Sequence, residues 1–194
     1  MNTGSMRPPG RTTIVMLLRQ LLAIAALPFT VTVLVPAWIS RRSGVAFARA
    51  DGAVEIVLQL AGLALLVVGL ILFATSLRRF ATEGRGTLAP WDPPRELVVR
   101  GPYRFVRNPM ISGVVLILFA ESLVMLSTAL LYWAALFLAI NLVHIPLIEE
   151  PRLRQRFGHA YLEYCRHVPR LLPRLRPWDR DARTEPHPGP HRER

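Results

Sequence analysis

Hydrophobic residues in this chain are gathered into long blocks, whereas a water-soluble core would show them at periodic spacing. Three blocks stand out, at residues 14–39, 54–77 and 111–148. A helix that crosses a bilayer needs about 20 predominantly apolar residues, so each of the first two blocks predicts one crossing. The third block is too long for one crossing and predicts two short helices with a tight turn near Ser127–Thr128. The pattern predicts an all-α polytopic membrane protein with four transmembrane helices, the last two forming a tight hairpin.

A further helix is predicted just after the last apolar block. Pro151 is tolerated in the first turn of a helix, and Val168-Pro169 ends it. Between them, apolar and aromatic residues recur at helical spacing on one face, namely Leu153, Phe157, Tyr161 and Tyr164. The arginines lie mostly off that face. This pattern predicts a C-terminal amphipathic helix at the membrane surface, although ordinary packing also produces aromatic stripes of this kind.

Composition and charge place the chain in a membrane rather than on a nucleic acid. The 194 residues are 52% hydrophobic with mean hydropathy +0.31, and all 24 basic residues are arginine. The net charge of +11 does not form one basic stripe, because the arginines flank the apolar blocks. They concentrate in residues 78–107 and after residue 148, so the positive-inside rule predicts that both termini are cytoplasmic. Arginine without lysine favours a bacterial inner membrane.

The polar chemistry is expected in one part of the chain. Residues 1–96 are interpreted as N-terminal membrane helices and a cytoplasmic linker, residues 97–174 as the functional region, and residues 175–194 as a disordered tail. A single cysteine, Cys165, excludes an intrachain disulfide and a thiolate metal cluster. No metal site is expected, and the oligomeric state cannot be read from the sequence.

The segment "GPYRFVRNPMISG", residues 101–113, holds two arginines, two prolines and two aromatic rings. The prolines restrict the backbone, so this loop has a defined shape. Asn108 is a candidate N-cap with Pro109 at the first helical position, and the free N–H groups of such a helix end attract anions. Gly113 removes a side chain where something approaches the backbone closely. The simpler interpretation is an interfacial anchor, since Tyr and Arg are common at headgroup depth.

Two adjacent carboxylates, Glu149 and Glu150, follow the last apolar block directly. Acidic residues are out of place beside an anionic leaflet, so the pair indicates a cationic or polyhydroxyl partner. Two more polar residues interrupt apolar sequence. Glu121 is either an intramembrane functional group or a paired carboxylate near the outer turn, and His144 either lines a ligand pocket or is a hydrogen-bonded core histidine.

Two motifs resemble the isoprenylcysteine carboxyl methyltransferase family, which also groups with phospholipid N-methyltransferases. The first is "LVVRGPYRFVRNPMISG", residues 97–113, in which Arg107, Pro109 and Gly113 match while Asn108 replaces a histidine and Ile111 a tyrosine. The second, within residues 149–174, matches at Glu149, Glu150, Phe157, Gly158, Tyr161, Tyr164, Pro169 and Arg170. The resemblance covers the C-terminal half of the chain.

The resemblance implies that both motifs enclose S-adenosylmethionine at the cytoplasmic surface. A carboxylate from Glu149 or Glu150 would hold the ribose hydroxyls or the ammonium group, and Arg107 or the helix start at Asn108 and Pro109 would hold the carboxylate. Gly113 would let adenosine lie against the helix. Aromatic faces for adenine or the sulfonium would come from Tyr103, Tyr161 or Tyr164, and His144 is a further candidate for the pocket.

Methyl transfer needs alignment and water exclusion more than a nucleophile–base pair. Arg170 is the candidate that orients a carboxylate acceptor, and Glu150 is the candidate base for an amine acceptor. The acceptor is expected to be lipophilic and to enter through the bilayer. Two other functions remain open: an NADPH-dependent enzyme like the sterol reductases, whose C-terminal segments look similar, and a non-catalytic membrane scaffold that kept the fold.

Overall fold

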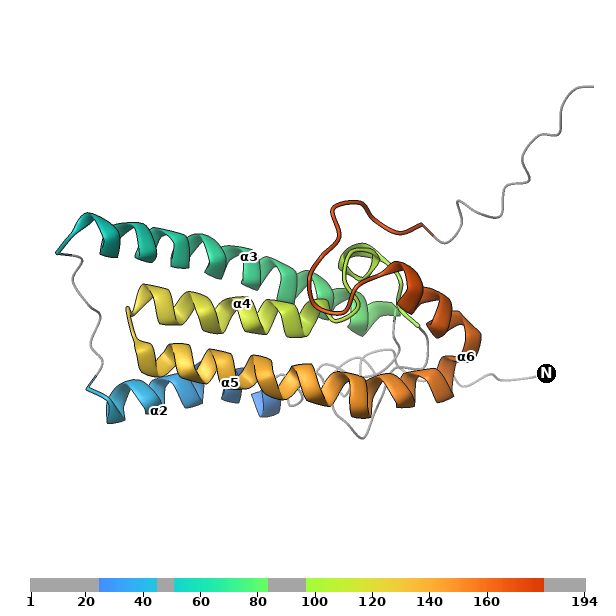
Figure 1. The fold of residues 1–194 in the computed structure, drawn as a ribbon, viewed down its shortest axis with the longest axis horizontal. Coiled ribbons are helices and arrows are strands. Elements are labelled where there is room, and N and C mark those ends of the chain that lie inside the picture. Colours follow the sequence, from blue (N-terminus) through green and yellow to red (C-terminus); the bar gives the residue numbers. More distant parts are fainter. Residues whose placement is uncertain (1–24, 45–50, 84–96, 180–194) are drawn as a thin grey trace, which may run out of the picture.

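The structure, a computed structural model, describes residues 25–44, 51–83 and 97–179, and its regular elements in these ranges are all helical. In Figure 1, α3, α4 and α5 run side by side, α2 lies along α5, and α6 folds over one end of the bundle. The elements, in chain order, are η1 (Ala25–Leu34), α2 (Val35–Arg42), α3 (Ala53–Glu83), η2 (Gly101–Arg104), α4 (Pro109–Val124), α5 (Thr128–His144), η3 (Ile145–Glu149) and α6 (Glu150–His167).

The predicted all-α class is confirmed for the described residues, and two of their helices are long and apolar enough to cross a membrane. One runs over Ala53–Arg79, and the other is the continuous helical path Thr128–His167. Helix α4 is apolar but has only 16 residues. Of the first expected span, residues 14–39, the part before residue 25 lies outside the described residues, and the remainder forms η1 and the start of α2.

Helices α3 and α4 pack closely because glycines face the neighbouring helix. A Cβ atom added at Gly113 would lie 2.9 Å from the backbone nitrogen of Phe73 and 3.0 Å from the carbonyl oxygen of Gly69. Gly62 lies two helical turns before Gly69 on α3, and a Cβ atom added there would lie 2.9 Å from the Cβ of Leu123. Small residues at such crossings let helix backbones approach, which maximises dispersion contacts where no water is available to drive association.

The break between α4 and α5 lies beside the turn expected near Ser127–Thr128. The backbone N–H of Ser127 donates to the carbonyl of Ser122 at 2.9 Å, and its hydroxyl accepts from the N–H of Leu130 at 3.3 Å. Ser127 is therefore the N-cap of α5 and satisfies one of the free donors at its start. Across the bundle, the indole N–H of Trp133 donates to the carbonyl of Val31 at 3.1 Å, which fixes η1 against α5.

Pro151 does not open a separate helix, contrary to the sequence prediction. Helices α5, η3 and α6 follow one another without a break, because the backbone at His144, Glu149 and Glu150 stays helical. The change of direction comes later, at Gly158, where φ is 53° and ψ is −130°. This conformation is accessible essentially to glycine alone. The second half of α6 folds back toward the loop before α4 (Figure 1).

The aromatic residues of α6 therefore do not form one continuous helical face. Phe157 precedes the kink while Tyr161 and Tyr164 follow it, yet all three contact the same hydrophobic cluster because the helix folds back on itself. The buried members of this cluster are Tyr161, Tyr164, Val168 and Trp178. The predicted packing role is present, but a backbone reversal rather than helical periodicity produces it.

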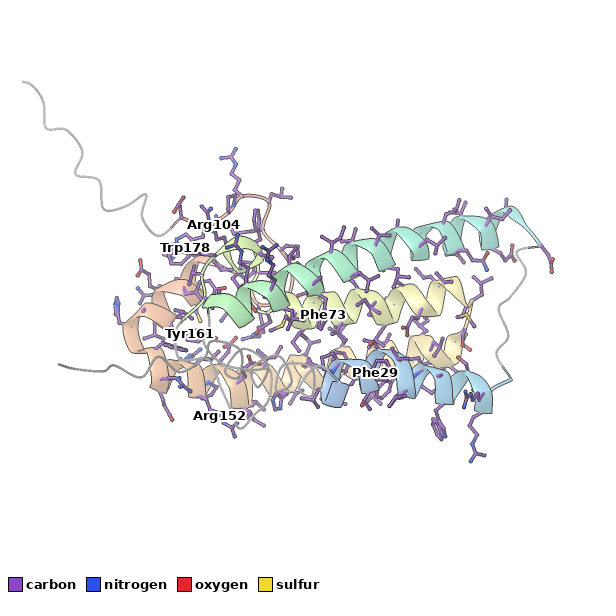
Figure 2. All side chains as sticks on the ribbon, turned by 180° about the vertical axis from the view of Figure 1, so that it is seen from behind. Phe29, Phe73, Arg104, Arg152, Tyr161 and Trp178 are labelled. Carbon is purple, nitrogen blue, oxygen red and sulfur yellow. The ribbon has the colours of Figure 1, made fainter. Side chains whose placement is uncertain are left out.

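Trp178 corrects the expected start of the disordered tail at residue 175. Its side chain is only 6% exposed, its backbone N–H donates to the carbonyl of Arg104 at 2.9 Å, and its ring stacks on His167 with centroids 5.2 Å apart. Figure 2 shows Arg104, Tyr161 and Trp178 at the same end of the bundle. A large aromatic ring is thus buried at position 178 despite polar neighbours. Residues 180–194 lie outside the described residues.

Replacing Gly158 by alanine is expected to lower the free energy of unfolding by about 1–3 kcal/mol, because a side chain strains this backbone conformation. No atom lies within 4 Å of an added Cβ, so the loss would come from the backbone alone. Denaturant unfolding in detergent, followed by tryptophan fluorescence, measures it. The matched control is Gln155→Ala, at an exposed helical position of α6, which should change stability by less than about 0.5 kcal/mol. Equal stability of the two variants would contradict the strained kink.

Candidate functional site

Two segments about sixty residues apart are joined by main-chain hydrogen bonds at the end of the bundle. The N–H of Arg107 donates to the carbonyl of Pro169 at 2.8 Å, and that of Asn108 donates to the carbonyl of Arg170 at 3.1 Å. The hydroxyl of Ser112, in the first turn of α4, donates to the carbonyl of Leu171 at 2.9 Å. The loop before α4 and the segment after α6 therefore form one unit, as the two sequence motifs require if they share a site.

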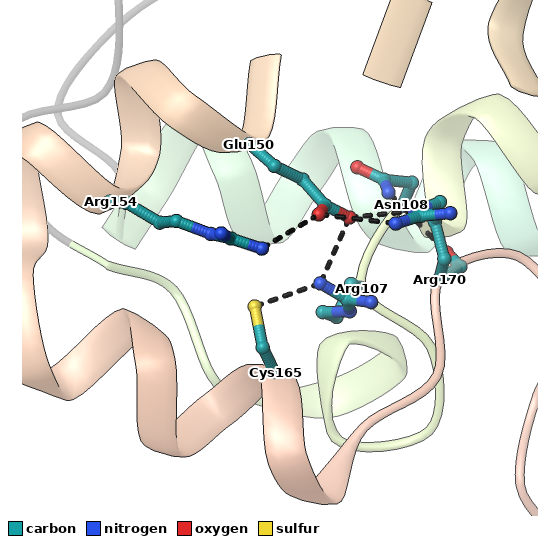
Figure 3. A network of polar contacts seen from close by, with 6 residues as sticks. All are labelled: Arg107, Asn108, Glu150, Arg154, Cys165 and Arg170. Carbon is teal, nitrogen blue, oxygen red and sulfur yellow. Dashed lines mark hydrogen bonds and ion pairs between the residues drawn. The ribbon is translucent and has the colours of Figure 1, made fainter. Parts of the chain in front are cut away.

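The carboxylate of Glu150 lies at the centre of this unit (Figure 3). It is 2% exposed. Its Oε1 accepts from Nη1 of Arg107 at 3.0 Å and from Nε of Arg170 at 2.7 Å, and its Oε2 accepts from Nη2 of Arg170 at 3.2 Å. Nη2 of Arg154 lies 3.6 Å from Oε2. One buried carboxylate thus connects the loop before α4, helix α6 and the segment that follows it.

Burial and the neighbouring arginines have opposite effects on the pKa of the Glu150 carboxyl. Burial alone raises the pKa of the Glu150 carboxyl, but the Arg170 hydrogen bond and the charges of Arg107, Arg170 and Arg154 outweigh it and lower the pKa below its usual range. Glu150 is therefore ionised at neutral pH, and its hydrogen bond raises the pKa of Arg170 in turn. A carboxylate with a lowered pKa is a poor proton acceptor, which argues against the sequence prediction of Glu150 as a base.

Two buried polar atoms in the loop before α4 have no partner in the described part of the chain. They are the hydroxyl of Tyr103 and Nε of Arg107. The side chain of Arg107 is 10% exposed, and its Nη1 also donates to the sulfur of Cys165 at 2.8 Å. Tyr103 is 8% exposed, and its carbonyl accepts from the Tyr164 hydroxyl at 2.6 Å. Unpaired buried donors cost free energy, so a pair of them indicates a ligand that supplies acceptors.

Glu149 differs from its neighbour although the two carboxylates are adjacent in sequence. Its side chain is partly exposed and, within the described residues, has no hydrogen-bond or ion-pair partner. Burial and the charge of Glu150 raise the pKa of the Glu149 carboxyl. The Glu149 charge also raises the pKa of the Tyr103 hydroxyl, after the larger effect of burial. The Glu149 carboxylate, partly exposed at the start of α6, is therefore available to a ligand.

The other predicted site residues have different surroundings. Pro109 is buried at the first position of α4, as expected, but the side chain of Asn108 makes no cap and instead donates to the carbonyl of Arg170 at 3.4 Å. Gly113 faces α3 and leaves no room for adenosine, so that prediction is corrected.

His144 is exposed in the last turn of α5 and neither lines the site nor packs in the core. Buried Oε2 of Glu121 is unpaired among the described residues, at the other end of α4.

An apolar cavity of about 560 Å³ is lined in part by the loop before α4 and the segment after α6. No charged side chain lines it. Its wall is formed by α3, α4, α5, the loop before α4 and the segment after α6, through Val68, Ile71, Leu72, Thr75, Pro102, Phe105, Val106, Ser112, Val115, Leu116, Leu138, Leu171, Leu172 and Pro173. Val106 and Leu171 directly adjoin Arg107 and Arg170 in the chain, so the cavity ends beside the polar unit.

Three features of the site were missed by the sequence analysis. Arg154 is four residues after Glu150, a spacing that places both on one helix face and should have indicated the pair. The contact of Cys165 with Arg107 and the cavity wall depend on long-range folding, for which the sequence gives no local signal.

Alanine substitutions of the three arginines should destabilise the protein in order of their burial. The Arg107, Arg170 and Arg154 side chains are 10%, 34% and 53% exposed. Removing Arg107 leaves a buried carboxylate partly uncompensated and should cost about 3–5 kcal/mol. Removing Arg154 breaks a solvent-screened pair and should cost less than about 1 kcal/mol, with Arg170 between them. Denaturant unfolding of the three variants provides the comparison, and a reversed order would contradict the geometry.

Comparison with curated proteins finds one similar segment. This segment of 81 residues is 37% identical to part of a Delta(14)-sterol reductase of Mus musculus. The match covers 41% of this chain and 19% of that reductase. The similarity therefore concerns a small part of the larger protein. No solved structure matches the chain significantly.

The phospholipid methyltransferase family profile matches residues 57–160. The match runs from near the start of α3 through the kink of α6 and includes Arg107, Glu149 and Glu150. It agrees with the resemblance seen in the two motifs and with the apolar helices that carry them. The chain belongs to the phospholipid methyltransferase family of membrane proteins.

Proposed function

We propose that the protein transfers a methyl group from S-adenosylmethionine to a lipophilic acceptor, an amine or a carboxylate, at the cytoplasmic face of a membrane. The observation that carries this proposal is the junction at Glu150. It unites both motifs in one unit and leaves Tyr103 Oη, Arg107 Nε and the Glu149 carboxyl without partners among the described residues.

These residues fit the chemistry of S-adenosylmethionine, which supplies an electrophilic methyl group on a sulfonium. Nε of Arg107 would donate to its carboxylate, and Glu149 would accept from its ribose hydroxyls or face its positive charges. The Tyr103 hydroxyl would complete the polar contacts. Glu150 itself is occupied by arginines, so its role would be to hold Arg107 and Arg170 in place. The protein's contribution to rate would come from alignment and from keeping water out.

The apolar cavity supports a lipophilic acceptor. Its volume of about 560 Å³ lies within the range of ligand pockets, about 300–1,000 Å³, and its wall includes residues adjacent to Arg107 and Arg170. An apolar chain in the cavity would leave its polar end near the ionic cluster. Arg170 is then placed to orient a carboxylate acceptor, whereas an amine acceptor needs a base other than Glu150.

The proposal includes a membrane arrangement in which the apolar blocks make four crossings, with α4 and α5 as the final hairpin and both termini cytoplasmic. In this arrangement the crossing part of α5 and η3 ends at Ile148, the last apolar residue before the carboxylates. The arginines after that point support this orientation, since Arg152, Arg154 and Arg156 are exposed beyond the apolar end of the helix. A bacterial inner membrane remains part of the proposal.

A second candidate is an NADPH-dependent reductase, favoured by the local similarity to the sterol reductase. That similarity spans only 19% of the reductase, so it is weak support for a shared reductase activity. Equilibrium binding of both nucleotides to the purified protein separates the candidates: saturable binding of S-adenosylmethionine supports the first, and NADPH binding alone supports the second.

Tyr103→Phe provides the sharpest test of the proposed site. The change deletes an unpaired buried hydroxyl, so stability should stay equal or rise by up to about 1 kcal/mol, while affinity for S-adenosylmethionine should fall about 5- to 30-fold. Isothermal titration gives the affinity. Incubation with methyl-labelled S-adenosylmethionine and a total lipid extract then gives the rate at which label enters the organic phase.

The matched control is Arg152→Ala. This side chain is exposed and points away from the site in Figure 2, so both affinity and methylation should match the wild type. If Tyr103→Phe bound S-adenosylmethionine as tightly as the wild type, the hydroxyl would have no ligand role. If the wild-type protein bound none, the methyltransferase proposal would fail.

A further inference from the structure

The segment after α6 exposes leucine side chains although it lies outside every apolar block of the sequence. Leu172 is 81% exposed and Leu175 is 98% exposed. Other exposed apolar residues, such as Ile71 at 59%, lie on helices that are apolar enough to cross a membrane, where lipid covers them. In Figure 1 the segment after α6, drawn in red, runs back from α6 along the bundle. We call residues 171–176 the wedge.

The wedge lies beside the apolar part of α3. Its residues 171–173 line the same cavity as Val68 and Ile71 of that helix, which are 54% and 59% exposed. Val68 lies about 14 Å inside the end of the apolar block 54–77, at a helical rise of about 1.5 Å per residue. The wedge therefore reaches the level of a helix that is long and apolar enough to cross a membrane. Its exposed leucines continue the lipid-facing surface of α3.

The main chain of the wedge is hydrogen-bonded to the elements beside it. The carbonyl of Leu171 accepts from the Ser112 hydroxyl at 2.9 Å, and the N–H of Arg174 donates to the carbonyl of Phe105 at 3.0 Å. Pro173 has no N–H to satisfy. Irregular backbone is tolerated at membrane depth only where the protein satisfies its polar groups, whereas a loop in water can leave them to solvent. Internal main-chain pairing together with exposed leucines therefore indicates a lipid environment.

We propose that the wedge docks into the bilayer leaflet at this end of the bundle, with Leu172 and Leu175 among the acyl chains and Arg176 at a lipid phosphate. Arg176 is exposed, it adjoins Leu175, and the wedge contains no acidic residue, so its charge suits an anionic headgroup. Leucine and arginine side by side are typical of segments that lie at a membrane interface. A second copy of this chain fits the wedge less well, because both copies carry a net charge of +11 and repel each other.

Photo-cross-linking identifies what covers the wedge. Leu172 or Leu175 would be replaced by p-benzoylphenylalanine in the full-length chain, in nanodiscs of phosphatidylcholine and phosphatidylglycerol, and irradiated for mass spectrometry. Both side chains are exposed, so the change removes little packing. The preference of a large apolar side chain for lipid corresponds to roughly 10-fold in population, so lipid adducts should exceed those at Gln155 by about 10-fold. Gln155 is an exposed polar position on α6, and the same probe at Ile71 is the positive control.

Arg176→Gln tests the headgroup contact in the same experiment. One arginine near an anionic surface favours anionic lipid by about 5-fold, so adducts at position 175 should contain phosphatidylglycerol about 5-fold more often than phosphatidylcholine. This preference should disappear in Arg176→Gln and persist in the control Arg152→Gln. Equal yields from the two lipids before any change at Arg176 would overturn the headgroup contact.

Two other results would overturn the docking itself: cross-links from the wedge to a second protein chain in place of lipid, or lipid adducts no more frequent than at Gln155. The measurement needs neither a methyl donor nor an acceptor. Its result is therefore separate from that of the proposed methyl transfer, and either proposal can fail while the other holds.

Discussion

The site depends on one buried negative charge that must be compensated. An ionised carboxylate removed from water is strongly unfavourable unless cations and hydrogen bonds replace its hydration. Glu150 meets this requirement only when Arg107, from the loop before α4, and Arg170, from the segment after α6, both reach it. A local charge therefore fixes a long-range geometry, and the groups around it, Tyr103 and Glu149, acquire defined positions as a consequence.

Two backbone features bring these residues within reach of one another. The uninterrupted path from α5 into α6 carries Glu150 past the apolar end of the bundle, and the positive φ at Gly158 turns the chain back so that Tyr164 and Trp178 pack over Tyr103's loop. Close packing of α3 on α4 through Gly69 and Gly113 fixes the start of α4. Loop, kink and helix crossing together keep the polar unit beside the apolar cavity.

Features with a local physical cause could be predicted from the sequence. The apolar blocks predicted the helical class. Asn108-Pro109 predicted the start of α4, because proline is favoured at a first helical position. The motifs also indicated that Arg107, Glu150 and Arg170 belong to one region. Features that depend on tertiary contact were not predictable: Gly113 is an unspecific signal for close approach, and only the fold decides that α3 fills the space. The burial of Trp178 was also not predictable, because its neighbours in the sequence are polar and only the fold shows that its side chain is buried.

The most direct measurement is a double-mutant cycle between the two partners of the central ion pair. Arg107→Met, Glu150→Gln and the double variant would be compared with the wild type by denaturant unfolding in detergent. If compensation of Glu150 by Arg107 holds the two segments together, the coupling energy should exceed about 1.5 kcal/mol, as for close charge pairs in desolvated interfaces. Effects that add to within about 0.5 kcal/mol would mean that the two side chains act independently, and the account would be wrong.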